Sequence, residues 1–409
     1  MVFPLTPESG LGESGTRPGG TIAEASPEDV RWMREAIALS AQVLYLTNPN
    51  PRVGCVIVRD GQVLASGATQ AVGGPHAEAM ALRQAQERGV DIAGATVYVT
   101  LEPCSHFGRT PPCADALIKA RPARVVIAMS DPNPLVGGQG VARLRAAGIQ
   151  VTLPVCAEEA LALNPGFVSR MLCQTPWVWL KSAASLDGQT ALPNGVSQWI
   201  TGPQARADGH HWRARSCVVL TGSGTVLADD PLLTVRDVAT PRQPRRAVLD
   251  SKLIVPETSR FFDAPGSMVF TCHADPEKTA RLVARGVQVV ELPAHNGHVD
   301  LNAVMQWLGA NAVNEVHVEA GARLHGALLQ AGCVDELLVY LAPMVLGSGQ
   351  GMYGLPVLTA LDEVQRYDFL EPAQFGPDMR LRLRRPDRWA QLLAAVSTDL
   401  SLAQSKHTD

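Results

Sequence analysis

The sequence predicts two consecutive α/β domains, and three observations support this fold class. The chain has 409 residues, a length that favours two domains over one. Short runs of Val, Ile and Leu, such as residues 55–58 and 124–129, alternate with helix-forming segments, a pattern typical of sheets covered by helices. The hydrophobic share of 46% and charged share of 18% are those of a globular protein with a sizeable core.

The first domain is expected at residues 27–173, as an α/β/α sandwich on a mixed sheet. Residues 1–26 lack periodicity and are rich in Gly, Pro, Ser, Thr and Glu, which predicts a disordered extension. Ser26, Pro27 and Asp29 then have the N-cap, first-turn and acidic positions of a helix start. Asp60-Gly61 predicts a hairpin turn. The expected strands are 55–58, 63–67, 96–100, 124–129 and 149–153; the expected helices are 76–88, from 112, 141–147 and 157–163; residues 164–175 are interpreted as a connector.

The second domain is expected at residues 174–388, followed by a tail at 389–409. It again alternates strands with helices, so a second α/β domain is predicted. The expected strands are 177–183, 217–220, 246–250, 268–270, 288–292, 315–319 and 337–341, and the expected helices are 208–215, 301–308 and 323–330.

A metal-ligand pattern lies in the first half. His76, Cys104 and Cys113 can supply three zinc ligands and leave a fourth position open, which is typical of a catalytic zinc site. Glu78 follows His76 by two residues, and His-x-Glu followed by Pro-Cys and a second Cys is the pattern of zinc deaminases. Zinc lowers the pKa of its bound water, and Glu78 is placed to take that proton and pass it to the leaving ammonia. The positive ends of two helices would favour thiolates here.

Other interpretations of these residues remain open. A His at a helix start is often a cap, and two Cys are often buried thiols. A closed structural zinc site with His106 as the fourth ligand is also possible. The loop between Cys104 and Cys113 is longer than the usual Cys-x-x-Cys and contains Arg109, a plausible phosphate contact.

The overall charge argues against a nucleic-acid-binding protein. The net charge is −4, and no basic stripe of the kind that binds a phosphate backbone is present. The 8 cysteines are mostly scattered, as expected for reduced thiols of a cytoplasmic protein. No apolar run is long enough to span a bilayer, and the N-terminus lacks the features of a signal peptide, so no membrane association is expected.

Two glycine-containing turns in the second half follow strands and open helices. These turns are residues 222–224 and 320–323, and backbone N–H groups at a helix start can bind a phosphate. Neither turn has the Gly-x-Gly-x-x-Gly spacing of a Rossmann fold. Arg213 and Arg236 could grip a substrate phosphate, although a solvated or salt-bridged Arg is an equally simple interpretation.

Several motifs resemble the bifunctional deaminase/reductase family of riboflavin biosynthesis, from about residue 28 to about 385. They are residues 48–51 (Asn-Pro-Asn-Pro), 76–78, 99–113, 131–134, 180–188, 197–202, 225–236 and 318–321. The resemblance implies a cytidine-deaminase-like first domain and a second domain similar to dihydrofolate reductases. It further implies hydrolytic deamination of 2,5-diamino-6-(5-phosphoribosylamino)pyrimidin-4-one. NADPH-dependent reduction of the ribosyl chain would then give 5-amino-6-(5-phosphoribitylamino)uracil. A homo-oligomer is implied as well.

The resemblance also implies roles for individual residues. Zinc would be bound by His76, Cys104 and Cys113, with Glu78 as the proton shuttle. The implied substrate contacts are Asn48, Asn50, Arg109, Asn133, Ser197, Arg213, Leu233, Arg236 and Glu319. The implied NADP contacts are Ala183, Trp199, Thr225, Asp229, Ser251, Gly321, Ala322, Arg323, Leu324, His325 and Gly326. Lys181 and Asp187 match the family too, with a structural or a proton-delivering role left open.

Three alternatives remain at this point. Only one half could be active, or the deaminase could act on another pyrimidine or on a purine. From a different class, the chain could be a non-catalytic zinc module that binds nucleotides or RNA, although the absence of a basic stripe and the presence of Glu78 argue against it.

Overall fold

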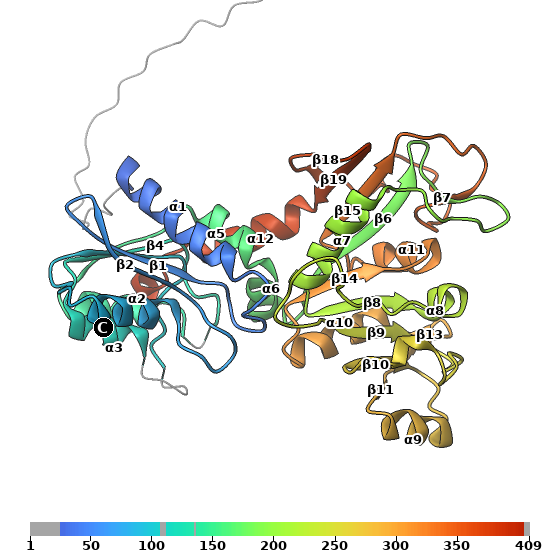
Figure 1. Cartoon of the computed structure of the whole chain (residues 1–409), viewed down its shortest axis with the longest axis horizontal. Coiled ribbons are helices and arrows are strands. Elements are labelled where there is room, and N and C mark those ends of the chain that lie inside the picture. The colour runs from blue at the N-terminus through green and yellow to red at the C-terminus, as the bar shows by residue number, and fades with distance from the viewer. Residues whose placement is uncertain (1–24, 107–111, 135, 405–409) are drawn as a thin grey trace, which may run out of the picture.

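The computed structural model describes residues 25–106, 112–134 and 136–404, without the side chains of 403 and 404. The N-terminal extension expected at residues 1–26 therefore lies almost entirely outside the described part. The two halves of the chain form two α/β bodies joined side by side (Figure 1). The predicted α/β fold class is confirmed in both halves.

The first half contains a mixed sheet with the strand order β2-β1-β3-β4-β5. Strand β1 is antiparallel to β2 and β3, whereas β3, β4 and β5 are parallel. Helices α1 and α5 cover one face, and α2 and α3 lie on the other (Figure 1). The elements are α1 (Pro27–Gln42), β1 (Gly54–Arg59), β2 (Gln62–Ala68), α2 (Ala77–Glu87), β3 (Thr96–Val99), α3 (Cys113–Ala120), β4 (Arg124–Ile127), α4 (Gln139–Ala146), β5 (Gln150–Thr152), α5 (Ala157–Leu163) and α6 (Pro165–Cys173).

Local signals in the sequence account for several of these elements. The predicted cap of α1 is confirmed as a capping box, in which the Ser26 hydroxyl accepts from the backbone N–H of Asp29 and the Asp29 carboxylate accepts from that of Ser26. Asp60 and Gly61 both have positive φ angles, as a two-residue turn between β1 and β2 requires. The predicted hairpin is therefore confirmed.

The interpretation of residues 164–175 as a connector is wrong, because residues 165–173 form helix α6. Pro165 and Gly166 look like helix breakers, but a proline in the first turn costs no hydrogen bond. Burial of Phe167 and Val168 then stabilises the helix. The domain boundary near residue 173 stays a prediction; α6 ends there and the next strand begins at Trp177.

Within the described residues, the second half contains a larger sheet with the order β11-β10-β9-β8-β14-β6-β15-β19-β17 and with β18 beside β19. The strands from β11 to β15 are parallel, and β19 pairs antiparallel with β15. Its main elements are β6 (Trp177–Ser185), α7 (Pro203–Arg215), β8 (Val218–Gly222), α8 (Ser223–Asp229), β9 (Arg245–Leu249), β10 (Ser267–Thr271), α9 (Pro276–Ala284), β11 (Gln288–Glu291), α10 (Leu301–Ala310), β14 (Glu315–Glu319), α11 (Ala322–Gln330), β15 (Glu336–Ala342), β17 (Asp368–Phe369), β18 (Ala373–Phe375), β19 (Asp378–Arg384) and α12 (Pro386–Val396). Smaller pieces are the ladders β12 (Ala294–His295) with β13 (His298–Val299) and β7 (Gln189–Ala191) with β16 (Gln350–Gly351), and the short helix α13 (Ser401–Gln404).

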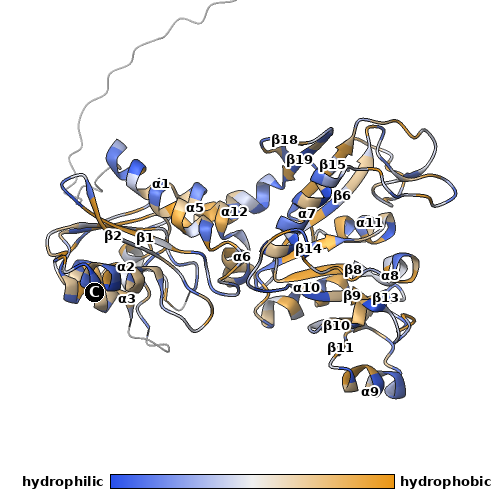
Figure 2. Ribbon diagram, in the orientation of Figure 1, coloured by the Kyte–Doolittle hydropathy of each residue, from blue (hydrophilic) through white to orange (hydrophobic). Residues whose placement is uncertain are grey.

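One buried hydrophobic cluster spans both halves, and the second half contains two further clusters of its own. The buried cluster of the first half continues into Trp177, Trp179 and Tyr340 of the second sheet and into Trp389 of α12. Figure 2 shows hydrophobic residues along the central strands of the second sheet. Burial of aromatic side chains contributes strongly to stability, so this continuity holds the two halves together.

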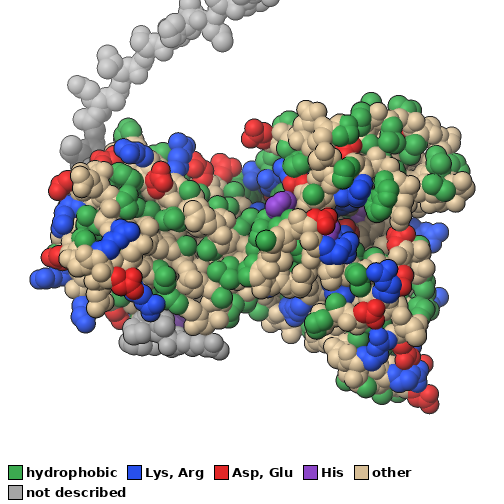
Figure 3. All heavy atoms as spheres, in the orientation of Figure 1, with side chains coloured by type: hydrophobic (Ala, Val, Ile, Leu, Met, Phe, Trp, Pro, Cys, Tyr) green, Lys and Arg blue, Asp and Glu red, His purple; other side chains and the backbone are tan. Residues whose placement is uncertain are grey.

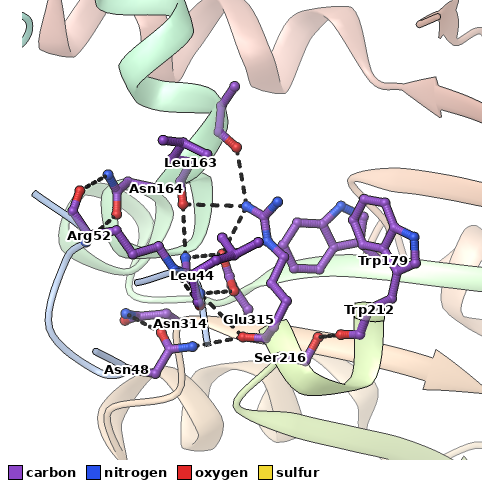
Figure 4. Close-up of polar contacts among 12 residues, drawn as sticks. Leu44, Asn48, Arg52, Leu163, Asn164, Trp179, Trp212, Ser216, Asn314 and Glu315 are labelled. Atoms are coloured by element: carbon purple, nitrogen blue, oxygen red, sulfur yellow. Dashed lines mark hydrogen bonds and ion pairs between the residues drawn. The ribbon is translucent and has the colours of Figure 1, made fainter. Parts of the chain in front are cut away.

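A buried ion cluster lies at the junction of the two halves (Figure 4). The Arg52 guanidinium makes two hydrogen bonds of 2.7 Å to the Glu315 carboxylate, and Arg215 lies 3.2 Å from the same carboxylate. The Glu315 side chain is fully buried. Although burial raises its pKa, Arg52 and Arg215 lower it, and the net shift is downward. The Glu315 carboxylate therefore pairs with one guanidinium from each half, Arg52 of the first and Arg215 of the second.

The visible surface carries charges of both signs. Figure 3 shows Lys and Arg interspersed with Asp and Glu on the face in view. Among the described residues, no helix is both long enough and apolar enough to cross a bilayer.

Candidate functional site

The three predicted zinc ligands meet at the boundaries of separate elements. His76 is the N-cap of α2, Cys113 is the first residue of α3, and Cys104 lies in the loop that follows β3. Their ligand atoms all lie within 4.8 Å of one another. The arrangement brings together side chains from two helix starts and a strand end, as the sequence predicted.

The spacing of these atoms fits zinc. The His76 Nδ1 atom lies 3.6 Å from Cys104 Sγ and 3.4 Å from Cys113 Sγ. Tetrahedral coordination with Zn–N of about 2.0–2.1 Å and Zn–S of about 2.3 Å places nitrogen and sulfur about 3.5 Å apart. The donor set of one imidazole and two thiols is also the one that zinc prefers. The residues present therefore fit a zinc ion with one open position.

The electrostatic environment prepares one thiol for metal binding. The hydrogen bond between the two thiols lowers the pKa of Cys104 to about 4, and burial opposes this shift. The backbone N–H of Cys113, at the start of α3, also donates to Cys104 Sγ at 3.3 Å. A helix N-terminus stabilises thiolate over thiol, as expected from the sequence.

Glu78 lies in the first turn of α2 and is 4% exposed. Burial raises the pKa of its carboxyl group to about 7. A carboxyl group with such a pKa can both accept and donate a proton near neutral pH. The structure therefore gives Glu78 the environment of a proton shuttle beside the three ligands.

Sequence reasoning missed Glu102, which organises the loop around Cys104. Its buried carboxylate accepts from the backbone N–H groups of Asp131 at 3.1 Å, Gly138 at 2.9 Å and Val141 at 3.1 Å. It thereby joins the segment of Cys104 to both ends of the 130–138 loop, of which residue 135 lies outside the described part. Its place two residues before Cys104 was the only signal.

The four remaining predicted contacts of this half have different positions. The Asn48 amide is buried at the junction of the halves, where it donates to the Arg215 carbonyl at 2.8 Å (Figure 4). Asn50 closes a turn through its N–H to the Thr47 carbonyl at 2.8 Å. Asn133 lies in the 130–138 loop, and Arg109 lies outside the described residues. All four stay predictions as substrate contacts.

The second half contains a cavity of about 1860 Å³. It opens at the carboxyl ends of β6, β8, β9 and β14, where α/β sheets bind ligands. All five predicted substrate contacts of this half line it, namely Ser197, Arg213, Leu233, Arg236 and Glu319. Ten of the eleven predicted cofactor contacts line it as well: Ala183, Trp199, Thr225, Asp229, Ser251, Gly321, Ala322, Arg323, Leu324 and His325.

Gly326, the eleventh, faces a different neighbour. A Cβ at this position would lie 2.2 Å from the Gly354 carbonyl oxygen, so only glycine lets the two segments approach. His325 accepts from the Ala320 N–H at 3.3 Å, and burial lowers its pKa to about 4. His325 and Gly326 therefore maintain the local structure of the cavity wall at residues 321–326.

An ion pair lies in the cavity wall. The Arg213 guanidinium forms a bidentate ion pair with the Glu319 carboxylate. Arg213 Nη2 donates to Glu319 Oε2 at 2.9 Å, and Arg213 Nε donates to Glu319 Oε1. Burial alone would raise the pKa of Glu319. The neighbouring Arg213 guanidinium lowers it by more than burial raises it, so the pKa of Glu319 lies well below its usual range. The backbone of Arg236 is held by His210 Nδ1 at 3.1 Å. Arg213 and Glu319 thus hold each other in place in the cavity wall, whereas the Arg236 side chain is exposed.

Further cavity residues were not predicted or were left undecided. The Arg206 guanidinium stacks on the exposed Trp199 ring, 4.3 Å from its centroid, and both line the cavity. Lys181 also lines it, and burial lowers its pKa. Asp187 is not among the residues that line the cavity, and its carboxylate accepts from the backbone N–H of Leu346 at 3.1 Å. No local motif in the sequence marked Arg206.

Comparisons with known proteins agree with this two-part arrangement. Residues 26–129 match the cytidine and deoxycytidylate deaminase zinc-binding region, and residues 176–381 match the RibD C-terminal domain. The riboflavin biosynthesis protein RibD of Escherichia coli (strain K12) is 48% identical over 369 residues, covering 87% of this chain and 99% of that protein.

Solved structures give the same result. Acinetobacter baumannii RibD, form 1, superposes with a TM-score of 0.81 at 43% identity and covers 87% of this chain and 98% of that one. The deaminase/reductase from Thermotoga maritima has a TM-score of 0.78 at 33% identity, with the same coverage. The chain therefore belongs to the RibD family, the bifunctional enzymes of riboflavin biosynthesis that combine a zinc-region deaminase domain with a reductase domain.

Proposed function

We propose that the first domain hydrolyses 2,5-diamino-6-(5-phosphoribosylamino)pyrimidin-4-one to its deaminated form and ammonia. The second domain then reduces the ribosyl chain with NADPH to give 5-amino-6-(5-phosphoribitylamino)uracil. One observation carries the proposal: a zinc-spaced His76, Cys104 and Cys113 cluster beside buried Glu78 occurs in the same chain as a large cavity with fixed charges.

In the deaminase half, the protein supplies ligands and a proton carrier. His76, Cys104 and Cys113 would hold the zinc ion, which lowers the pKa of a bound water towards neutrality. Glu78 would take one proton from the attacking water and give it to the ring nitrogen. It would then take the remaining proton from the new hydroxyl on the ring carbon and give it to the departing amine, so that the carbonyl forms as ammonia leaves. Its burial keeps the carboxyl group able to do both near neutral pH.

In the reductase half, the protein positions the sugar against the cofactor. NADPH supplies the hydride. The start of α11 at Gly321 and Ala322 offers backbone N–H groups to a phosphate of the cofactor. Arg236, whose side chain is exposed in the cavity, is the proposed partner of the substrate phosphate. The Arg213–Glu319 pair orients the ribosyl hydroxyls through charge-assisted hydrogen bonds.

Two further parts of the proposal concern the setting of the enzyme. None of the 8 cysteines, all of which lie in the described residues, forms a disulfide, which supports a reducing, cytoplasmic location. The resemblance supports a homo-oligomer, and sedimentation analysis of the purified chain tests it.

The proposed function is tested by mass spectrometry of the products formed from the diaminopyrimidine ribotide. Without NADPH we expect the mass change of replacing an amino group by oxygen. With NADPH we expect this change plus two hydrogens. Replacing NADPH by NADH tests the cofactor. Unchanged substrate with zinc present would exclude the proposed deamination, and a product that never gains hydrogen would exclude the proposed reduction.

Replacing Arg236 by Ala tests the phosphate contact. A charge-assisted hydrogen bond of about 1.5–3 kcal/mol corresponds to an increase of about ten- to hundredfold in the KM for the deaminated ribotide. We expect kcat to change much less, because the phosphate is remote from the reacting carbon. Arg281→Ala, on the outer helix α9, is the matched control because its side chain is also exposed. An unchanged KM in Arg236→Ala would exclude this contact.

A further inference from the structure

The segment after α12 returns to the deaminase half. Helix α12 packs against α5 and α6, and residues 397–402, which we name the C-terminal strap, follow it. Figure 1 shows α12 in red beside α5 of the first domain. The strap lies outside both matched regions, residues 26–129 and 176–381. The functions of the two matched domain families therefore do not account for the strap.

The strap lies directly on the 130–138 loop. The Ser130 hydroxyl donates to the Thr398 carbonyl of the strap at 2.6 Å, and its backbone N–H donates to the carbonyl of Val396, the last residue of α12, at 2.9 Å. A Cβ added to Gly138 would lie 2.8 Å from the Leu400 backbone, so the two segments touch along their main chains. The loop is thus covered by the strap at both its beginning and its end.

An ion pair anchors the strap to the neighbouring helix α4. Arg145 of α4 lies 2.7 Å from the Asp399 carboxylate and also donates to the Ser401 hydroxyl. The Asp399 side chain is only 12% exposed, which strengthens the pair relative to a surface ion pair. The Ser401 hydroxyl in turn donates to Asp399 at 2.6 Å. These bonds fix the strap in one position.

The other side of the loop contacts the segment of Cys104. Glu102 accepts from the N–H groups of Asp131 and Gly138, at the two ends of the loop. The Asp131 carboxylate accepts from the N–H of Asn133 at 2.9 Å. The loop therefore lies between the strap and the segment that supplies a zinc ligand, and it carries Asn133, a predicted substrate contact.

We propose that the C-terminal strap is a positioning element for deamination. It presses the 130–138 loop onto Glu102 and so fixes the wall of the pyrimidine site. None of the strap residues is among the three candidate zinc ligands or among the residues that line the reductase cavity. Its loss should affect substrate binding by the deaminase half and leave zinc binding and reduction intact. The inference rests on the proposed deamination.

The test compares the full chain with a chain that stops after Ser397. A misplacement of about 1 Å can cost about a hundredfold in rate, so we expect kcat/KM for deamination to fall about ten- to hundredfold, mainly through KM. Zinc content and reduction of the deaminated ribotide should not change. A chain that stops after Gln404 keeps the strap and should behave like the full chain. Asp399→Ala with Leu400→Ala in the full-length chain should reproduce the rise in KM.

Each outcome has a defined meaning. A KM rise in both altered chains, with zinc and reduction retained, supports the inference. Unchanged deamination in both, or deamination lost together with zinc, overturns it, since the strap would then be dispensable or merely structural. A full chain that never deaminates the ribotide excludes the proposed function and the inference with it. Equal activity of the full and shortened chains excludes the inference alone.

Discussion

Replacing Glu78 by Gln is expected to lower the rate of deamination by about 10²–10⁴-fold, the usual contribution of a general acid–base group. Gln has nearly the same shape as Glu but cannot carry a proton between water, ring nitrogen and amine. The buried position of Glu78 leaves no room for bulk water to replace it. The measurement is ammonia release from the diaminopyrimidine ribotide at saturating substrate.

The control for this variant is Glu87→Gln, at the exposed end of the same helix. Both variants should retain one zinc per chain, because neither carboxylate is a ligand in the predicted set. Both should also reduce the deaminated ribotide at the normal rate. Normal ammonia release by Glu78→Gln would show that another group moves the proton.

The second large effect is expected from Glu315→Ala at the junction of the domains. The substitution leaves the buried Arg52 and Arg215 without their carboxylate, and breaking a buried pair costs about 3–5 kcal/mol. This is a large part of the stability of an ordinary domain. The free energy of unfolding, from denaturant titration, is the measurement.

A surface pair provides the comparison for this substitution. Glu257→Ala removes the nearer of the two carboxylates that pair with Arg281, whose side chain is 54% exposed, and should cost less than about 1 kcal/mol. If Glu315→Ala were as mild as Glu257→Ala, the buried cluster would not contribute to the stability of the chain.

The zinc site could be predicted from the sequence because each ligand belongs to a short motif at the boundary of an element. His76 and Cys113 start helices whose composition is visible locally, and Cys104 follows a clear strand. The order and spacing of these motifs were therefore enough to predict which three side chains lie together. The residues of the reductase cavity come from many separate loops, and only the resemblance to a family indicated them together.

Other features depend on partners far along the chain. The direction of the Asn48 side chain is set by the Arg215 carbonyl, 167 residues later, which no local motif can reveal. Helix α12 did have a local signal, since Trp389, Leu392 and Val396 are apolar at helical spacing. It was nevertheless interpreted as a tail, because it lies beyond the family resemblance.

The buried pair of Arg52 and Glu315 has a consequence for synthesis on the ribosome. The two residues are 263 positions apart. At a translation rate of about 5–20 residues per second, Arg52 emerges about 13–50 s before its partner. During this interval the guanidinium can donate to the Leu44 and Leu163 carbonyls of its own domain, but the edge that pairs with Glu315 stays hydrated and the adjoining apolar face stays uncovered. The first domain to be made is therefore among the last to be completed, and this long-lived intermediate is where chaperones would engage the growing chain.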